Sequence, residues 1–317
     1  MGENRRLGSM NILVMGAGAI GSLFGGLLSH AGNEVTLVGR ASHMEQVKTH
    51  GLTIRHADGE VVTKPYGVTH PPQLTGSRFD LILLTVKAYD TRTAARRLQP
   101  LLHGETMMVS LQNGLGVEDE ILEATGRSDI SRALTSCGAS IIRPGEVSFN
   151  GGGATTIGCY SPEAASAVKV VARILREAGI QAETTPNLQS AVWTKTLVNA
   201  AINPLGTLTQ TRNGQLLESA GLRNMMIDVV EEGVRVAEAT GVTLQSNPVE
   251  VMLRTAQATA LNENSMLQDI RRRRRTEVDY INGAIVRKAR DVAVAAPLNS
   301  ALTELIKGLE TATLERQ

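Results

Sequence analysis

The glycine-rich segment Gly16-Ala17-Gly18-Ala19-Ile20-Gly21 constrains the fold of this chain more than any other feature. It follows the apolar run Ile12–Met15 and leads into the apolar stretch Ala19–Leu28, which is the pattern of a buried strand, a tight turn and a buried helix. Glycines at such a turn let the backbone approach a pyrophosphate, while the helix N-terminus supplies N–H donors to the phosphates. The pattern favours dinucleotide binding by these six residues over a purely structural turn.

The stretch from Asn11 to Asn33 contains no charged side chain, as signal peptides and membrane spans also do. Its six glycines divide it into short apolar runs, so we interpret it as part of a globular fold and expect no membrane association. Residues 1–9 resemble an addition ahead of a natural start at Met10, and we leave them out of the fold prediction.

Predicted strands alternate with predicted helices up to about Asn113. The strands are Ile12–Met15, Val35–Val38, Leu81–Val86 and Met107–Leu111, and helices begin at Ala19, Ser42 and Thr91. Nearly continuous apolar strands separated by helices predict a parallel sheet covered on both faces. The segment Gly51–Val68 interrupts this alternation with a turn at Asp58-Gly59, and we expect an antiparallel excursion there.

Further strands are expected between Ala133 and Tyr160, followed by a helix over Pro162–Ala178 and a strand near Gln181–Thr184. After Pro186 the apolar spacing is helical throughout, with Asn247-Pro248 opening one helix and Gly241 closing another. The predicted fold class is therefore α/β, with an N-terminal doubly wound sheet in a dinucleotide-binding domain over 10–186 and an all-helical substrate-binding domain over 187–317.

Charge and cysteine content limit the partners of the chain. Its 317 residues carry 32 basic and 31 acidic side chains, a net charge of +1 that gives no global attraction to nucleic acid or anionic membranes. The two cysteines, Cys137 and Cys159, form no disulfide framework and no metal-ligand spacing is present, so we expect a reduced cytoplasmic protein without a metal site. Both cysteines are expected to be small buried residues of the strands after residue 130. All six histidines precede residue 104, so proton chemistry in the later half needs another group.

The end of the second predicted strand indicates which dinucleotide is bound. A site specific for NAD usually places an acid there, whereas this strand ends Val38-Gly39-Arg40. Arg40 is able to form a bidentate contact with a 2′-phosphate, so the sequence favours NADP(H) over a merely solvated arginine.

Two other polar residues follow strand ends. Lys87 comes after Leu81–Val86 and Asn113 after Met107–Leu111, at the sheet edge where open α/β sheets bind ligands. Each residue alone is equally consistent with a turn or a helix cap, but the pair favours a functional site.

A helical segment after Pro186 carries a polar stripe. Lys195, Asn199 and Asn203 stand four residues apart and therefore share one helix face, without an acidic partner for the lysine four residues away. One interpretation is a solvated stripe. The other is a row of donors facing a ligand, with Lys195 as the proton donor to a carbonyl that accepts hydride.

The segment Asn262–Glu277 contains a run of arginines, Arg271–Arg275, that is flanked by acids. Asp269, Arg273 and Glu277 have helical i, i+4, i+8 spacing, so we expect an ion-pair ladder and no nucleic-acid binding. Spacing alone leaves open whether Glu277 belongs to this ladder or to the chemistry.

Taken in order, these motifs resemble the 2-dehydropantoate 2-reductase (ketopantoate reductase) family. The resemblance rests on G-A-G-A-I-G, V-K-A-Y, L-Q-N-G, W-x-K-x-x-x-N-A-x-x-N-P, N-x-x-S-M-L-Q-D and T-E-x-D-Y-I-N-G, and covers Met10 to about residue 310. It implies a Rossmann-type N-terminal domain and NADPH-dependent reduction of ketopantoate to (R)-pantoate, on the way to pantothenate and coenzyme A. The implied partner is a small 2-oxo acid, and a homodimer is compatible with it.

The resemblance also assigns roles. Lys195 and Glu277 match catalytic residues, and Asn199, Asn203, Asn262 and Ser265 match residues that hold the substrate. Arg40 matches the 2′-phosphate arginine, and Lys87 and Asn113 match cofactor-side and substrate-side positions. One departure is Asp90, where the family often has glutamine; an acid there either weakens phosphate-side contacts or caps the next helix.

Three alternatives stay open on the sequence. One is a reductase of the same family that acts on another 2-oxo acid. A β-hydroxyacid dehydrogenase is less favoured, because Ser190-Ala191-Val192-Trp193 stands where that class has glycines before its lysine. The third is a non-enzymatic NADP sensor, which needs residues 16–40 but not Lys195 and Glu277.

Overall fold

The computed structural model describes residues 8–151 and 153–315. The described chain forms two compact units. The first comprises residues up to Gln112 together with Val117–Leu188, and the second comprises Asn113–Gly116 and the chain from Gln189 onward. A four-residue segment of the N-terminal half therefore belongs to the C-terminal unit.

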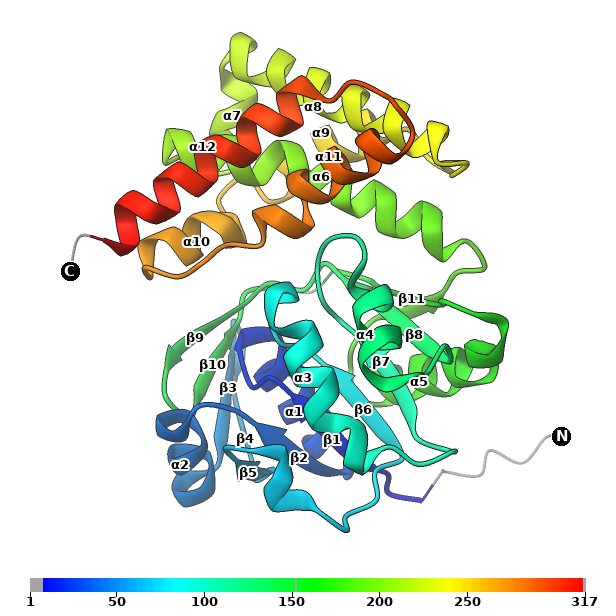
Figure 1. Ribbon diagram of the computed structural model, residues 1–317. Coiled ribbons are helices and arrows are strands. Elements are labelled where there is room, and N and C mark those ends of the chain that lie inside the picture. The colour runs from blue at the N-terminus through cyan, green and yellow to red at the C-terminus, as the bar shows by residue number, and fades with distance from the viewer. Residues whose placement is uncertain (1–7, 152, 316–317) are drawn as a thin grey trace, which may run out of the picture. The chain divides into compact units, whose positions relative to one another are not determined.

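Eight of the described strands build the main sheet of the first unit (Figure 1). They are β1 (Asn11–Met15), β2 (Glu34–Val38), β5 (Tyr66–Val68), β6 (Leu81–Leu84), β7 (Met107–Ser110), β8 (Ile130–Thr135), β11 (Thr155–Cys159) and β12 (Ala182–Thr184). Their spatial order is β12-β11-β8-β7-β6-β1-β2-β5.

Six neighbouring strands, from β5 to β8, run parallel, with β1 paired to both β2 and β6. Numbered along the chain, they have the order 3-2-1-4-5-6 of the Rossmann fold, whose strand order reverses beside β1. β11 adds antiparallel to β8 and carries β12. The prediction of a doubly wound sheet is confirmed, and predicted strands end within two residues of the observed ones.

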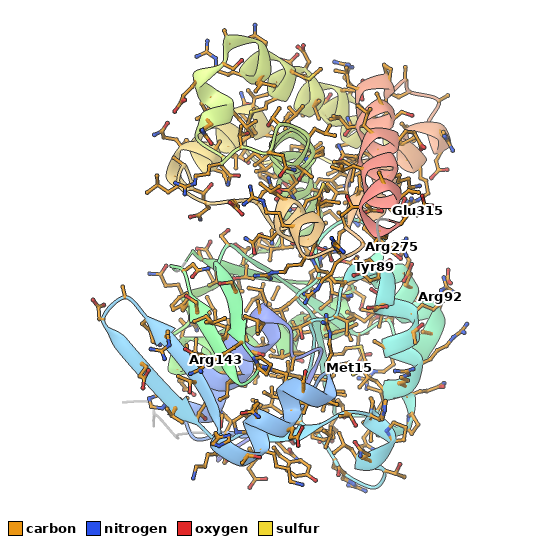
Figure 2. The ribbon with its side chains drawn as sticks, turned by 90° about the vertical axis from the view of Figure 1, so that its left-hand side faces the viewer. Met15, Tyr89, Arg92, Arg143, Arg275 and Glu315 are labelled. Carbon is orange, nitrogen blue, oxygen red and sulfur yellow. The ribbon has the colours of Figure 1, made fainter. Side chains whose placement is uncertain are left out.

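A second, four-stranded sheet has the order β4-β3-β10-β9. It consists of β3 (Leu52–His56), β4 (Gly59–Thr63), β9 (Ala139–Arg143) and β10 (Glu146–Phe149). β3 and β4 form the expected antiparallel hairpin. The expectation was wrong for the last three residues of the segment, because Tyr66–Val68 return to the main sheet as β5, parallel to β2. Figure 2 shows Arg143 on this small sheet, where its guanidinium and that of Arg55 both contact Glu146.

Helices cover both faces of the main sheet. They are α1 (Ala19–His30), α2 (Ala41–His50), α3 (Thr91–Leu98), α4 (Val117–Thr125) and α5 (Ala165–Glu177), with the short 3₁₀ turns η1 (Pro71–Leu74), η2 (Ala88–Asp90), η3 (Gln99–Leu101) and η4 (Pro162–Ala164). One buried cluster joins β1 to α1, α5 and the small sheet, and the other joins β1 to α3 and α4. Leu13 and Val14 point into different clusters, as strand alternation requires. Arg92 projects from α3 (Figure 2) and pairs with Glu123 of α4 at 2.6 Å.

In the second unit the described elements from Gln189 onward are all helical, as predicted (Figure 1). They are α6 (Leu188–Thr209), α7 (Gln215–Glu218), α8 (Ala220–Ala239), α9 (Pro248–Ala258), α10 (Ser265–Arg271), η5 (Val278–Tyr280), α11 (Asn282–Asp291) and α12 (Pro297–Leu314). Asn247 caps α9 by accepting from the N–H of Val249, as its position before Pro248 predicts. Within the described chain, no helix combines the length and the apolar character needed to cross a membrane.

The expectation that both cysteines are buried was wrong, because each side chain is only half-buried. The expected strand position is confirmed for Cys159 and wrong for Cys137. Cys159 is the last residue of β11. Cys137 follows the end of β8, where its N–H bonds to Thr135 Oγ1 instead of a neighbouring strand, and its Sγ donates to the carbonyl of Gly153.

Candidate active site

The glycine turn between β1 and α1 has three different local environments. Gly16 has a φ of +118°, and a Cβ there would lie 2.6 Å from the backbone nitrogen of Val86. A Cβ on Gly21 would collide with the carbonyl of Gly16, so this glycine allows α1 to pack against the turn. A Cβ on Gly18 would have no atom within 4 Å. Gly16 and Gly21 are therefore required by packing, whereas the space beside Gly18 is open.

Neighbouring strands fix the backbone of this turn. The N–H of Ala17 donates to the carbonyl of Val38 at 2.7 Å, and Thr85 Oγ1 donates to the carbonyl of Gly16 at 2.8 Å. Thr85 was not singled out by sequence reasoning; its place directly after β6, beside the strand that precedes the turn, is the signal that could have found it. The turn is thus fixed from both sides, which holds the first N–H groups of α1 in defined positions, and helix N-termini are places where proteins commonly bind anions.

Arg40 is exposed and directly precedes α2, two residues after the end of β2. The nearby His43 is buried, its Nδ1 accepts the N–H of Gly145 at 2.9 Å, and its Nε2 lies 3.0 Å from Ser22 Oγ. Burial first, and the charge of Arg40 second, lower the pKa of His43 below its ordinary value. Both effects favour the neutral form of His43, which links α2 to α1 and to the small sheet through these two contacts. Arg40 carries the positive charge at this strand end.

Lys87 is half-buried, three residues after the end of β6 and directly before η2. Asp90 lies at the N-cap position of α3 and is exposed, but its side chain makes no capping hydrogen bond. Asp90, the residue that departs from the pattern of the family that the sequence resembles, thus lies at the start of α3 without capping it.

A buried polar network lies under the end of β7. Gln112 is 3% exposed, and its Nε2 donates to Thr91 Oγ1 at 2.6 Å. Its carbonyl accepts from the guanidinium of Arg132, a residue that is 1% exposed and forms an ion pair with Glu118. Sequence reasoning missed this network, because nothing in the residues around Arg132 marks a charge as buried. The network fixes the backbone immediately before Asn113.

In the second unit, α6 is buried almost all round. Between Ser190 and Thr207, only Ala191, Lys195 and Asn199 keep intermediate exposure, and these three stand four residues apart. Asn203, the next residue along this line, is 5% exposed. Of the predicted stripe, Lys195 and Asn199 therefore lie on the accessible line of an otherwise buried helix, whereas Asn203 is buried.

Asn113 and Glu277 come together within the second unit. Asn113 Nδ2 donates to Glu277 Oε2 at 3.3 Å, and the N–H of Leu115 donates to the carbonyl of Tyr280 at 2.9 Å. Gly114, with a φ of +91°, lies so close that a Cβ there would collide with the backbone of Tyr280. Glu277 itself is 6% exposed, so its carboxylate is a buried acceptor.

Asn262 and Ser265 lie around the start of α10, and both are exposed. The carbonyl of Asn262 accepts the N–H of Asn213 at 3.0 Å. Between the two residues, Asn264 caps α10 through the N–H of Leu267 at 2.9 Å, and its Oδ1 also accepts from Thr207 of α6 at 3.3 Å. The bond from Thr207 ties the segment that carries Asn262 and Ser265 to the helix that carries Lys195.

The expected ladder of Asp269, Arg273 and Glu277 was wrong. α10 ends at Arg271, Arg273 adopts a φ of +51°, and the N–H of Arg274 bonds back to the carbonyl of Asp269 at 2.9 Å. This closure ends the helix, so the three residues do not share a helix face. Arg275, labelled in Figure 2, pairs with Asp279 at 2.9 Å, and Arg271 pairs with Glu263.

A Rossmann-type sheet followed by a helical unit is typical of the class of nucleotide-dependent oxidoreductases. Residues 12–162 match the family model described as ketopantoate reductase PanE/ApbA, and residues 187–310 match its C-terminal counterpart. The chain therefore belongs to the ketopantoate reductase PanE/ApbA family, whose members are oxidoreductases that act on CH–OH groups.

Individual relatives agree with this assignment. The chain is 39% identical over 302 residues to the 2-dehydropantoate 2-reductase of Pyrococcus horikoshii, covering 95% of this chain and 98% of that one. The crystal structure of a PanE/ApbA family ketopantoate reductase from Ralstonia eutropha is similar with a TM-score of 0.88 at 32% identity, covering 96% of this chain and 99% of that one. A ternary structure of D-mandelate dehydrogenase with NADH and anilino(oxo)acetate is similar with a TM-score of 0.90, also at 32% identity and the same coverage.

Proposed function

We propose that this protein reduces 2-dehydropantoate (ketopantoate) to (R)-pantoate, with NADPH as the cofactor and Lys195 as the general acid. Bound NADPH supplies the hydride that is transferred to the 2-oxo carbon. The proposal is supported by family membership and by relatives named 2-dehydropantoate 2-reductase at 39% and 40% identity over 95% of the chain.

The observation that carries the proposal is the exposure pattern of α6. Between Ser190 and Thr207 this helix keeps only Ala191, Lys195 and Asn199 partly accessible, so its lysine stands on a single accessible line of an otherwise buried helix. Negative charge develops on the carbonyl oxygen as the 2-oxo carbon is reduced, and an ammonium group stabilises that charge before it gives up a proton. Lys195 is the group on this line that has such a proton.

Glu277 acts on the lysine and not on the substrate carbon. Its carboxylate is buried and accepts a hydrogen bond from Asn113, which helps to orient it. A fixed carboxylate favours the charged form of a nearby ammonium group and holds its direction. In this proposal, Asn113 contributes to both the cofactor side and the substrate side of the site.

The substrate is held by polar side chains of the second unit. Asn199 and Asn203 extend the line of Lys195, and Asn262 and Ser265 lie on a segment bonded to the same helix through Asn264 and Thr207. Amide and hydroxyl groups donate to carboxylates and exchange hydrogen bonds with alcohols, the two polar groups of ketopantoate besides its carbonyl. Ser265 is assigned to the carboxylate.

The residues of the first unit fit a dinucleotide phosphate. The open space beside Gly18 admits a pyrophosphate at the start of α1, between two glycines that packing already requires. Ala17, Ala19 and Ile20 complete the turn, and Lys87 adds a positive charge at the same edge of the sheet. Arg40, exposed after β2 with no acid beside it in Val38-Gly39-Arg40, is assigned to the 2′-phosphate that distinguishes NADPH from NADH.

A second candidate is reduction of another 2-oxo acid by the same residues. It is favoured by the likeness to D-mandelate dehydrogenase, whose ternary structure contains NADH and anilino(oxo)acetate. Groups that hold the oxo-acid end set the chemistry, whereas the pocket around the rest of the molecule sets the specificity.

The decisive experiment is oxidation of NADPH, and in parallel NADH, by the purified protein with ketopantoate, benzoylformate and a series of aliphatic 2-oxo acids. Saturable turnover with ketopantoate and a preference for NADPH is the expected result. Turnover with benzoylformate alone would transfer the protein to the second candidate. Absence of turnover with every acid would contradict both.

The same proposal places the reaction in pantothenate and coenzyme A biosynthesis in the cytoplasm, carried out by one chain or by a homodimer. Size-exclusion chromatography with light scattering distinguishes the two assemblies.

A further inference from the structure

Pro204 lies inside α6 and leaves one backbone carbonyl of that helix without its usual donor. In an α-helix the N–H of residue i bonds to the carbonyl of residue i−4, and proline has no N–H. The carbonyl affected is that of Ala200, a fully buried residue. Asn282 supplies the missing donor, because its Nδ2 lies 2.9 Å from the oxygen of Ala200.

Other buried groups hold Asn282 in place. Its Nδ2 also donates to Asn299 Oδ1 at 3.0 Å, and Asn299 Nδ2 donates to Glu232 Oε1 at 2.8 Å. Glu232 further accepts the N–H groups of Leu298 and Asn299 at the start of α12. These side chains are 0–2% exposed. The carboxylate thus sets the amide orientation of Asn299, and Asn299 sets that of Asn282.

This chain of hydrogen bonds, from Glu232 through Asn299 to Asn282, reaches α6 close to the proposed acid. Ala200 follows Asn199 directly and is five residues from Lys195, on the same helix. Asn282 is the first residue of α11 and follows Glu277 after the single turn η5. One hydrogen bond therefore connects the helix of Lys195 with the segment of Glu277 in the interior of the unit.

We propose that Asn282 is a positioning residue of the reductase, which rests on the function proposed above. By satisfying the Ala200 carbonyl that Pro204 leaves open, Asn282 fixes the rotation and height of α6 relative to the Glu277 segment. Without this bond, α6 has a weak point four residues before its proline, and the direction of Lys195 is no longer set. Asn282 acts through the helix and does not touch the substrate.

The test is a double-mutant cycle of Asn282→Ala and Pro204→Ala. An alanine at position 204 restores a backbone N–H that is able to bond Ala200 within the helix, which makes the side-chain amide of Asn282 dispensable. We measure kcat and KM for ketopantoate, the Kd for NADPH, the pH dependence of kcat, and the melting temperature. Asn224→Ala, at an exposed asparagine of α8, is the matched control.

Asn282→Ala is expected to lower kcat about 10- to 100-fold and to shift the apparent pKa in the pH profile of kcat. The Kd for NADPH is expected to stay within about twofold of the wild-type value. The double variant with Pro204→Ala is expected to have a kcat at least about tenfold higher than that of Asn282→Ala alone. A fall in melting temperature with unchanged kcat and pH profile would overturn the inference, and so would a double variant no faster than Asn282→Ala.

Should Asn282→Ala not fold, Asn299→Ser is measured instead. It keeps the amide of Asn282 but removes what orients it, so a smaller loss of kcat, about 5- to 20-fold, is expected, and an unchanged kcat would overturn the inference. Failure of the underlying function is seen separately, because the wild-type protein would then turn over no 2-oxo acid.

Discussion

The side-chain amide of Asn113 donates a hydrogen bond to the carboxylate of Glu277, which lies 164 positions later in the sequence. The residues around it fit this contact, since Gly114 has no room for a side chain against Tyr280 and Leu115 bonds to the carbonyl of Tyr280. A loop that leaves the nucleotide-binding sheet thus joins the helical unit at the proposed acid–carboxylate pair.

Alanine substitutions at two glycines of the same turn are expected to affect different properties, stability for Gly21 and NADPH binding for Gly18. Gly21→Ala places a Cβ against the carbonyl of Gly16 and should destabilise the first unit by about 1–3 kcal/mol, measured by urea unfolding. Gly18→Ala places a methyl group in open space, so stability should stay within about 0.5 kcal/mol while NADPH binding weakens at least about tenfold. Equal NADPH affinity for Gly18→Ala and wild type would contradict the assigned position of the pyrophosphate.

Arg40 is expected to determine the choice of cofactor. Arg40→Ala removes a charge-assisted contact with the 2′-phosphate, so the Kd for NADPH should rise about 10- to 100-fold while that for NADH changes less than about threefold. Fluorescence titration with both nucleotides measures this. The matched control is Arg96→Ala, an exposed arginine of α3. A parallel loss of both nucleotides would show that Arg40 does not read the phosphate.

Arg273 has a backbone conformation that glycine adopts more easily. It follows the end of α10 with a φ of +51°, which costs about 1–2 kcal/mol for a residue with a side chain. Arg273→Gly should therefore raise the free energy of unfolding by about 0.5–1 kcal/mol after the larger unfolded-state entropy of glycine is subtracted. Arg272→Gly, at a φ of −90°, should lower it by a similar amount. Stabilisation by both substitutions would point to relief of arginine repulsion instead.

His43 should make stability depend on pH. Its folded-state pKa lies below the ordinary value of 6.5, mainly because it is buried and then because Arg40 is nearby. Protonation therefore favours the unfolded chain, so its contribution to stability is complete above pH 6.5 and falls as the pH drops below 6.5 towards the folded-state pKa, by at most about 1.4 kcal/mol per pH unit. His43→Gln offers an acceptor and a donor without titrating, so its unfolding free energy should fall less in this window. An equal slope for both proteins would contradict this account.

Much of the fold is predictable because it depends on local pattern. Apolar runs that alternate with helices specify the parallel sheet, and Gly16 and Gly21 mark the turn whose close contacts only glycine tolerates. Lys195, Asn199 and Asn203 fall on one line because helix geometry fixes their spacing. The three-residue strand β5 was misread because Tyr66–Val68 is too short to show a period, and its partner β2 lies thirty residues earlier.

The remaining features depend on contacts that sequence spacing does not encode. The arginine run has helical spacing, but the left-handed turn at Arg273 ends α10 before the expected ladder forms. Nothing near Asn113 indicates that it leaves the sheet for the helical unit, and nothing near Asn282 indicates that its amide replaces the N–H missing at Pro204. Both bonds join residues at least 82 positions apart, so they follow from the packed structure alone.

The most direct test of the account is a single-turnover measurement on Lys195→Ala beside wild type. NADPH oxidation is followed after mixing with saturating ketopantoate, and NADPH binding is titrated separately; Lys169→Ala, an exposed lysine of α5, is the control. We predict a loss of about 10²–10⁴ in the rate of hydride transfer for Lys195→Ala, with the Kd for NADPH within about twofold of wild type and Lys169→Ala unchanged. A Lys195→Ala variant that turns over at the wild-type rate would show that the lysine of α6 is not the proton donor, and the proposed mechanism would be wrong.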